Sequence, residues 1–124
     1  MIHLDTHVVI WLAERREGML SATARRTLDR EPIGVSAMVM LELETLHESG
    51  KLKNEPDRVI GILERNIGLG RSSAALADVV DAARTFAWTR DPFDRLIVAN
   101  AMADGVRLLT ADEHILRHFR DAVW

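Results

Sequence analysis

Four acidic residues stand where a carboxylate could do chemistry instead of facing solvent. Asp5 directly follows a short apolar run, and Asp112 comes soon after another such run. Glu42 and Asp94 lie within stretches whose apolar residues recur with helical spacing. Carboxylates that converge can hold a divalent cation or exchange protons with a substrate. We therefore take Asp5, Glu42, Asp94 and Asp112 as candidate catalytic and metal-binding residues.

The two helical acids are expected to face inward. At about 100° per residue, Glu42 falls beside Val39 and Leu46 on the buried side of its helix, whereas Glu44 points the opposite way. Asp94 heads the stripe of its helix that packs on the sheet. A charge that borders a core is costly unless it is paired or binds a metal, and no Lys or Arg lies within one turn of Glu42.

The chemistry of these ligands indicates which metal would bind. Converging carboxylates repel one another and hold protons more tightly unless a divalent cation supplies positive charge. Oxygen ligands are preferred by hard cations, so the predicted cofactor is Mg²⁺ or Mn²⁺. Zinc is disfavoured, because the chain has no cysteine and the pair His114 and His118, with its i, i+4 spacing, lacks a third ligand.

Structural interpretations of the same acids stay open. Asp5 and Asp112 could each be a helix N-cap, a role that contributes about 1 kcal/mol. Asp94 could complete a capping box with Asp91, which precedes Pro92. Gly68-Leu69-Gly70 lacks the remaining features of a phosphate-binding loop, so no nucleotide site is predicted there.

The elements that would position these acids form an alternating pattern. We expect buried strands at Ile2–Leu4, Ile33–Val35, Val106–Leu109 and Ala122–Trp124, with a weaker one near Leu69. We expect helices at Thr6–Ala13, Ser21–Arg30, Ala37–Ser49, Pro56–Ile67, Ala74–Ala87 and Pro92–Ala103. Apolar strands separated by helices predict a three-layer α/β/α domain with a central parallel sheet of four to five strands. Ligands of such sheets bind beyond the carboxyl ends of the strands.

Length and composition restrict the class of protein. The 124 residues, 48% of them hydrophobic, suit one domain spanning residues 1–124. The net charge of −3 gives no support for a strongly basic nucleic-acid module, although arginines gather between residues 15 and 30. No window is apolar enough for a membrane span, and the absence of cysteine is typical of a reducing compartment. We expect a cytoplasmic protein without membrane contact.

Over essentially its whole length, the chain resembles the PIN domain family, and within it the VapC-type toxins of toxin-antitoxin pairs. The resemblance rests on Ile2-His3-Leu4-Asp5-Thr6, on Ser36-Ala37 followed by Glu42, on Asp91-Pro92-Phe93-Asp94-Arg95-Leu96-Ile97-Val98-Ala99 and on Leu109-Thr110-Ala111-Asp112. The family's acidic cluster corresponds to Asp5, Glu42, Asp94 and Asp112. Many relatives have a histidine just before the third segment, where this chain has Trp88-Thr89-Arg90.

The resemblance implies a metal-dependent endoribonuclease that hydrolyses RNA phosphodiester bonds and leaves a 5′-phosphate and a 3′-hydroxyl. It implies metal contact by Asp5 and Asp94, a ligand or water-orienting role for Glu42, and a peripheral role for Asp112. It also implies a VapB-type antitoxin as partner and a homodimer. The alternative is a non-catalytic PIN-like module that binds RNA or protein. A phosphoacceptor domain is disfavoured, because Asp5 is followed by Thr6 and no lysine follows Lys53.

Overall fold

A sheet of five parallel strands forms the centre of the molecule. The computed structural model describes every residue from Met1 to Trp124. The strands lie in the order β3-β2-β1-β4-β5, and Leu4 of the central strand pairs with Leu109. Their bounds are β1 Ile2–Leu4, β2 Ile33–Val35, β3 Gly70–Arg71, β4 Arg107–Leu109 and β5 Ala122–Val123. The predicted parallel α/β architecture is confirmed, and the weak fifth strand is present.

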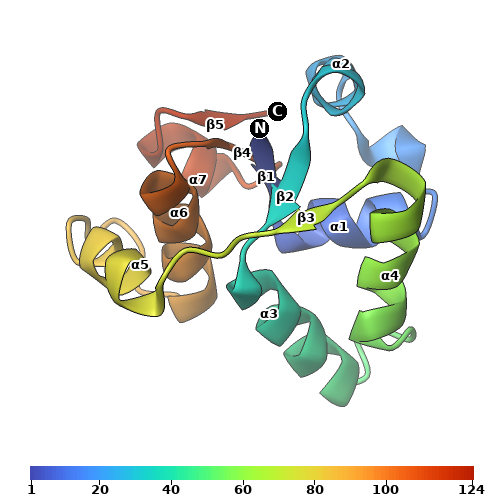
Figure 1. Cartoon of the computed structure of the whole chain (residues 1–124), viewed down its shortest axis with the longest axis horizontal. Helices are drawn as coiled ribbons and strands as arrows, with labels where there is room; N and C mark the ends of the chain where they lie inside the picture. The colour runs from blue at the N-terminus through green and yellow to red at the C-terminus, as the bar shows by residue number, and fades with distance from the viewer.

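Helices cover both faces of this sheet. Figure 1 shows α5 and α6 on one side of the strands, with α1 and α4 on the other. Helix α3 leaves β2 and contacts both α4 and α6. The bounds are α1 Thr6–Ala13, η1 Glu17–Met19, α2 Ala22–Arg30, α3 Ala37–Glu48, α4 Pro56–Ile67, α5 Leu76–Ala83, α6 Pro92–Asp104 and α7 Glu113–His118.

The structure differs from the sequence-based expectation most clearly at α5 and α7. The helix expected over residues 74–87 spans only Leu76–Ala83. The guanidinium of Arg95 donates to the carbonyls of Ala83 and Phe86, which ties the segment after α5 to α6 instead of extending the helix. Helix α7 was not expected, because six residues are too few for a periodic pattern to show.

Helix ends follow the capping chemistry that the sequence indicates. The hydroxyls of Ser21 and Ser36 accept backbone N–H groups at the starts of α2 and α3. Gly105 ends α6 in the left-handed conformation, with φ +64°. Gly50 also has a positive φ, one residue after the C-cap of α3. The Ser36 cap fixes where α3 begins and so sets the position of Glu42, which lies in the middle of that helix.

The core is continuous on both sides of the sheet. Ile2 and Leu4 of β1 and Leu108 and Leu109 of β4 are fully buried. They pack with residues of α1, α3, α4 and α6 in one apolar cluster. The apolar core thereby holds the strands in register, so that their carboxyl ends meet at one edge. No helix combines the length and apolar character that crossing a membrane requires.

Candidate active site

The four predicted acids line one pocket at the carboxyl ends of the central strands. The pocket has a volume of about 160 Å³. Each acid comes from a different segment of the chain: the β1–α1 junction, α3, α6 and the β4–α7 junction. No Lys or Arg lines the pocket; the residues that do are Asp5, Thr6, His7, Ile10, Glu42, Leu46, Asp94 and Asp112. The structure therefore brings all four carboxylates together.

Asp5 is the most buried of these acids, with 3% of its surface exposed. Its Oδ1 accepts the backbone N–H of Thr6 at 2.8 Å, so it also acts as the N-cap of α1. Its Oδ2 accepts the hydroxyl of Thr110 at 2.7 Å. Both oxygens are thereby held in place, which fixes the orientation of the carboxylate at the floor of the pocket.

Asp112 caps α7 and is linked to Asp5 through one threonine. Its Oδ1 accepts the N–H groups of His114 and Ile115 at 2.8 and 3.0 Å. Its own N–H donates to the hydroxyl of Thr110, which in turn donates to Asp5. The N-cap interpretation is therefore correct for Asp5 and Asp112, and both residues line the pocket as well. A cap uses one carboxylate oxygen of Asp112 and leaves the other available.

Asp94 is the acid whose ionisation is most perturbed. Burial raises its pKa to about 7, and the negative charges of Asp5, Asp91, Asp112 and Glu42 act in the same direction. Asp91 accepts the backbone N–H of Asp94 as the N-cap of α6. The backbone N–H of Asp91 donates to the hydroxyl of Thr89 instead of to the Asp94 carboxylate. Only one of the two hydrogen bonds of a capping box is therefore formed. The carboxylate of Asp94 does not take part in capping and lines the pocket instead.

Glu42 enters the pocket from α3 and is half-buried, whereas Glu44 is exposed as predicted. Burial raises the pKa of Glu42; the nearby Thr6 hydroxyl opposes part of this rise, and the charges of Asp5 and Asp91 add to it. The Thr6 hydroxyl is buried and has no hydrogen-bond partner. A polar atom in such a position is usually satisfied by water or a ligand, so the pocket has room for a polar occupant.

His7 is a pocket residue that the sequence did not single out. Its Nε2 accepts the N–H of Ala111 at 2.9 Å, so the ring proton resides on Nδ1. That Nδ1 lies 3.6 Å from Oδ2 of Asp5. The ring also packs against Trp11 and Trp124. His7 thus joins α1 to the loop that leads to Asp112, a role that depends on contacts between distant segments.

The ligand atoms that this pocket offers are oxygens, which are the atoms that hard divalent cations prefer. Four carboxylates share the pocket without a neutralising side chain, and the buried Thr6 hydroxyl is unpartnered. No three Asp, Glu or His side chains lie close enough together to hold a metal ion without moving. His114 and His118 are not part of any group of three possible ligands either. Binding of a cation would therefore require the carboxylates to move closer together.

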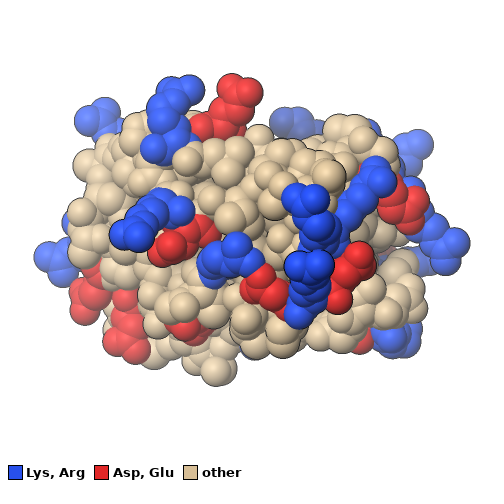
Figure 2. Space-filling model, turned by 90° about the horizontal axis from the view of Figure 1, so that it is seen from above, with Lys and Arg blue, Asp and Glu red and all other residues tan.

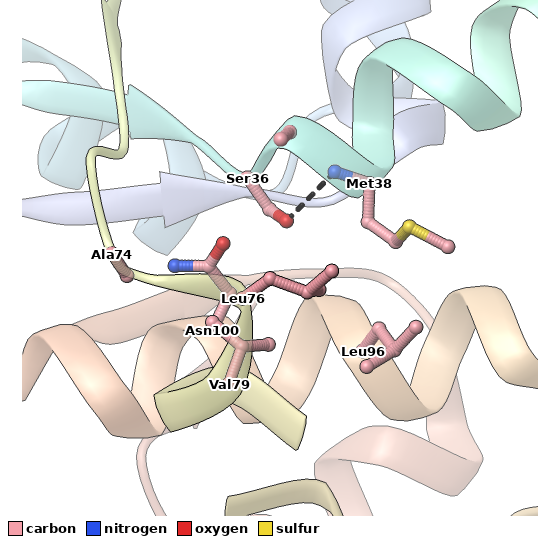
Figure 3. Close-up of a pocket in the computed structure, with 8 residues that line it drawn as sticks. Ser36, Met38, Ala74, Leu76, Val79, Leu96 and Asn100 are labelled. Carbon is pink, nitrogen blue, oxygen red and sulfur yellow. Dashed lines mark hydrogen bonds between the residues drawn. The ribbon is translucent and has the colours of Figure 1, made fainter. Parts of the chain in front are cut away.

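A second pocket, lined mainly by apolar side chains, differs from the acidic pocket in its polar groups. Figure 3 shows side chains from the start of α3, from α5 and from α6 around a smaller, mainly apolar space of about 90 Å³. Its polar groups are satisfied: Ser36 accepts the N–H of Met38, and Asn100 donates to Ser72 and Asp104. It contains no titratable side chain. The acidic pocket is therefore the candidate active site.

A sequence model of the PIN domain matches residues 2–121. The chain belongs to the PIN domain family. It is 28% identical over 120 residues to Ribonuclease VapC22 of Mycobacterium tuberculosis, which covers 93% of this chain and 89% of that relative. The resemblance to this family that the four sequence segments indicated is confirmed.

Solved structures show the same PIN fold. The structure of VapBC2 from Rickettsia felis, bound to a DNA fragment from its promoter, matches with a TM-score of 0.63 at 17% identity. That match covers 94% of this chain and 92% of the other. VapBC-1 from nontypeable Haemophilus influenzae matches with a TM-score of 0.59 at 17% identity, over 100% and 96% of the two chains. At this identity the likeness concerns the PIN fold alone.

Proposed function

We propose that this PIN domain is a metal-dependent endoribonuclease and the toxin of a toxin-antitoxin pair. The observation that carries the proposal is the convergence of four carboxylates from four segments in one pocket that no cationic side chain enters. The relative named Ribonuclease VapC22 supports RNA as the substrate. The non-catalytic alternative gives no reason for the cost of assembling these charges, because a binding module for RNA would gain from cations instead.

In this proposal Asp5, Glu42, Asp94 and Asp112 are the catalytic and metal-binding residues. A bound Mg²⁺ or Mn²⁺ would supply a water of lowered pKa as the nucleophile. Asp5 and Asp94 are the proposed direct ligands. Asp5 suits this role because Thr6 and Thr110 already hold its two oxygens in a fixed orientation.

The remaining acids have distinct proposed roles. Glu42 is half-buried beside the free hydroxyl of Thr6, and it is either a ligand or the group that orients the attacking water. Asp112 has a peripheral role, because its Oδ1 is already used to cap α7. Asp94 holds a proton in the free protein up to about pH 7, because burial raises its pKa, and it releases that proton when positive charge enters the pocket.

The proposal extends to partners and location. The solved relatives are VapBC structures, which supports a VapB-type antitoxin as the cognate partner of this chain. We also propose that the chain forms a homodimer. We further propose a cytoplasmic location, with which the absence of cysteine agrees. Mixing the chain with the product of a neighbouring antitoxin reading frame tests the partner: cleavage should stop at equimolar ratio, and unimpeded cleavage would contradict the assignment.

Cleavage of total RNA by purified protein tests the activity. We expect cutting in Mg²⁺ or Mn²⁺, none in EDTA, and product ends with a 5′-phosphate and a 3′-hydroxyl. Asp94→Asn should lower the rate by about 100-fold or more, which is the usual effect of removing a group that stabilises transition-state charge. Asp78→Asn, an exposed acid in α5, is the matched control and should cleave normally. Cleavage that persists in EDTA would contradict the metal mechanism.

A further inference from the structure

An aromatic cluster lies between the loop before α6 and helix α7. We call this group, Phe86, Trp88, His114 and His118, the ring cluster. The ring of Trp88 stacks on that of Phe86 at 5.2 Å between centroids with an interplanar angle of 17°. The ring of His118 stacks on Trp88 at 5.2 Å and 8°. His114 meets Trp88 edge-on at 5.3 Å. Three of the four rings are therefore nearly parallel.

Part of the ring cluster faces solvent in a fixed orientation. His114 and His118 are exposed, whereas Phe86 and Trp88 are half-buried against the core. Nε2 of His114 donates to the carbonyl of Trp88 at 2.7 Å, and Nδ1 of His118 donates to the carbonyl of His114 at 2.8 Å. These bonds hold two exposed imidazoles in place, although ordinary surface side chains change rotamer freely.

The ring cluster is joined to the acidic pocket by short hydrogen bonds. The N–H of His114 donates to Oδ1 of Asp112 at 2.8 Å. On the other side, Thr89 follows Trp88, its hydroxyl accepts the N–H of Asp91, and Asp91 accepts the N–H of Asp94. The two segments that carry the rings are thus the two segments that carry Asp94 and Asp112.

Positive charge flanks the ring cluster on both segments. Arg90 lies between Trp88 and Asp94 in the sequence, and Arg117 directly precedes His118 in α7. Both are exposed, and neither makes an ion pair. Figure 2 shows one face of the molecule, on which Lys and Arg are interspersed with acids instead of forming one continuous patch. Exposed arginines without an ion pair, on the two segments that carry the rings, provide contacts for a phosphate backbone.

We propose that the ring cluster stacks an unpaired nucleobase of the RNA, next to the phosphate held at the acidic pocket. This inference rests on the proposed ribonuclease function and adds a base-stacking surface formed by residues outside the acidic pocket. Single-stranded RNA is recognised by stacking of bases on aromatic and histidine rings, combined with cationic contacts to the backbone. His118 supplies the outer ring surface, Trp88 and Phe86 support it, and Arg90 and Arg117 contact phosphates.

The test compares two fluorescent RNA oligonucleotides with the same number of phosphates. One is oligoadenylate of about 12 nucleotides, within the usual footprint of single-strand binding, and the other is an abasic ribose-phosphate chain of equal length. Binding is measured by anisotropy with Asp94→Asn protein, which does not cut the probe. His118→Ala should weaken binding of oligoadenylate by about fivefold, at the low end of the range for one stacked base, and leave the abasic probe unaffected.

Two further variants separate stacking from charge. His118→Phe keeps a flat ring and should restore oligoadenylate binding. Arg117→Gln should weaken both probes to the same degree, because it removes a phosphate contact. The thermal midpoint of each variant shows that the fold is kept. Equal effects of His118→Ala on both probes, or failure of His118→Phe to restore binding, would overturn the stacking role.

Cleavage of total RNA by the unmodified chain is measured in parallel. If the chain cleaves RNA while His118→Ala binds both probes as tightly as its parent, the stacking inference alone fails. If the chain neither cleaves RNA nor binds either probe, the proposed function fails, and the inference fails with it.

Discussion

Helix α6 carries an aspartate near each end, and the two side chains have opposite surroundings. Asp104, in the last turn, accepts hydrogen bonds from Ser72 at 2.6 Å and Asn100 at 2.9 Å. His3, which is 2% exposed, places its Nε2 3.3 Å from the same carboxylate. Asp94, in the first turn, has four carboxylates around it and no side-chain donor to either of its oxygens.

The difference separates an acid whose charge is satisfied by neighbouring donors from one that the proposed function makes a metal ligand, within a single helix. The donors around Asp104 satisfy its charge, and they in turn depend on it, since His3 and Asn100 are buried. The surroundings of Asp94 disfavour its charge, so burial and repulsion raise its pKa to about 7. Such an arrangement lowers the stability of the free protein, and in the proposed function a bound cation relieves the repulsion.

The largest expected effect is the response to a cation. At a Mg²⁺ concentration of about 100 times its dissociation constant, the free energy of unfolding of the unmodified chain should rise by about 2.7 kcal/mol. Asp94→Asn should lose most of this gain. Asp104→Asn, on the same helix, should keep it. Chemical unfolding with Mg²⁺ and with EDTA measures the response, and an equal gain in both variants would remove the functional distinction between the two ends.

Truncation of the two aspartates should affect stability in different ways. Asp104→Ala removes the carboxylate beside His3 Nε2 and one of the two acceptors of the Asn100 amide, so the free energy of unfolding should fall by about 2 kcal/mol. Asp94→Ala removes a charge that nothing satisfies, so stability without metal should not fall at neutral pH. Urea unfolding in EDTA compares them. A loss in Asp94→Ala as large as that in Asp104→Ala would show that both acids are structural.

The raised pKa of Asp94 should be visible in the pH dependence of the free energy of unfolding. Its pKa is about 7 in the folded chain against 3.8 ordinarily, so folded protein binds this proton more tightly than unfolded chain. This contribution to stability is complete below about pH 4 and is lost as the pH rises through about 7. In EDTA, Asp94→Asn should match the unmodified chain below about pH 4 and exceed it by about 1 kcal/mol at about pH 8, after allowance for solvent screening.

Titration of His3 changes the free energy of unfolding with pH in the opposite direction. This change is the same in Asp94→Asn and in the unmodified chain, so it cancels when the two are compared. Burial lowers the pKa of His3, the charge of Asp104 opposes this shift, and the N-terminal charge adds to it. Stability therefore falls as the pH drops below about 6.5 in both proteins, and the difference between them is unaffected. A difference that does not change between pH 5 and pH 8 would contradict the assignment of a raised pKa to Asp94.

The smallest expected effect concerns the contact of His3 with Asp104, at the C-terminal end of α6. A Cβ on Gly34 would lie 2.9 Å from Cδ2 and 3.2 Å from Nε2 of His3, so Gly34→Ala should push this ring away from Asp104. We expect a loss of about 1 kcal/mol from overpacking, with the Mg²⁺ response unchanged. Thermal unfolding with and without Mg²⁺ measures both quantities. A changed Mg²⁺ response would show that the two ends of α6 are coupled.

The sequence predicted the strands and most helix ends because their signals are local. Ile2–Leu4 and Ile33–Val35 are short apolar runs, and Asp91-Pro92 is a strong start signal for α6. The ends of α5 and the presence of α7 were not predictable in this way. Arg95 stops α5 from another helix, and α7 is held by the bond between His114 and Trp88.

The four acids could be predicted because each lies at a strand end or on a buried helix face, and the ends of parallel strands meet. The residues that orient them could not be predicted. Thr110 holds Asp5 across 105 positions, and His7 holds Ala111 across 104. Such contacts leave no trace in local spacing. The cap interpretations were not true alternatives, since Asp5 and Asp112 both cap a helix and line the pocket.

A carbon-detected NMR titration of the Asp94 carboxyl group tests the central claim most directly. Burial and the charges of the neighbouring carboxylates should hold the pKa of Asp94 near 7 in EDTA, and saturating Mg²⁺ should bring it down toward the ordinary range, because the positive charge of the cation favours the ionised carboxylate. An Asp94 carboxyl group that titrates in EDTA in the ordinary range of an exposed aspartate, with no response to Mg²⁺, would contradict the account of this pocket as a metal-dependent active site.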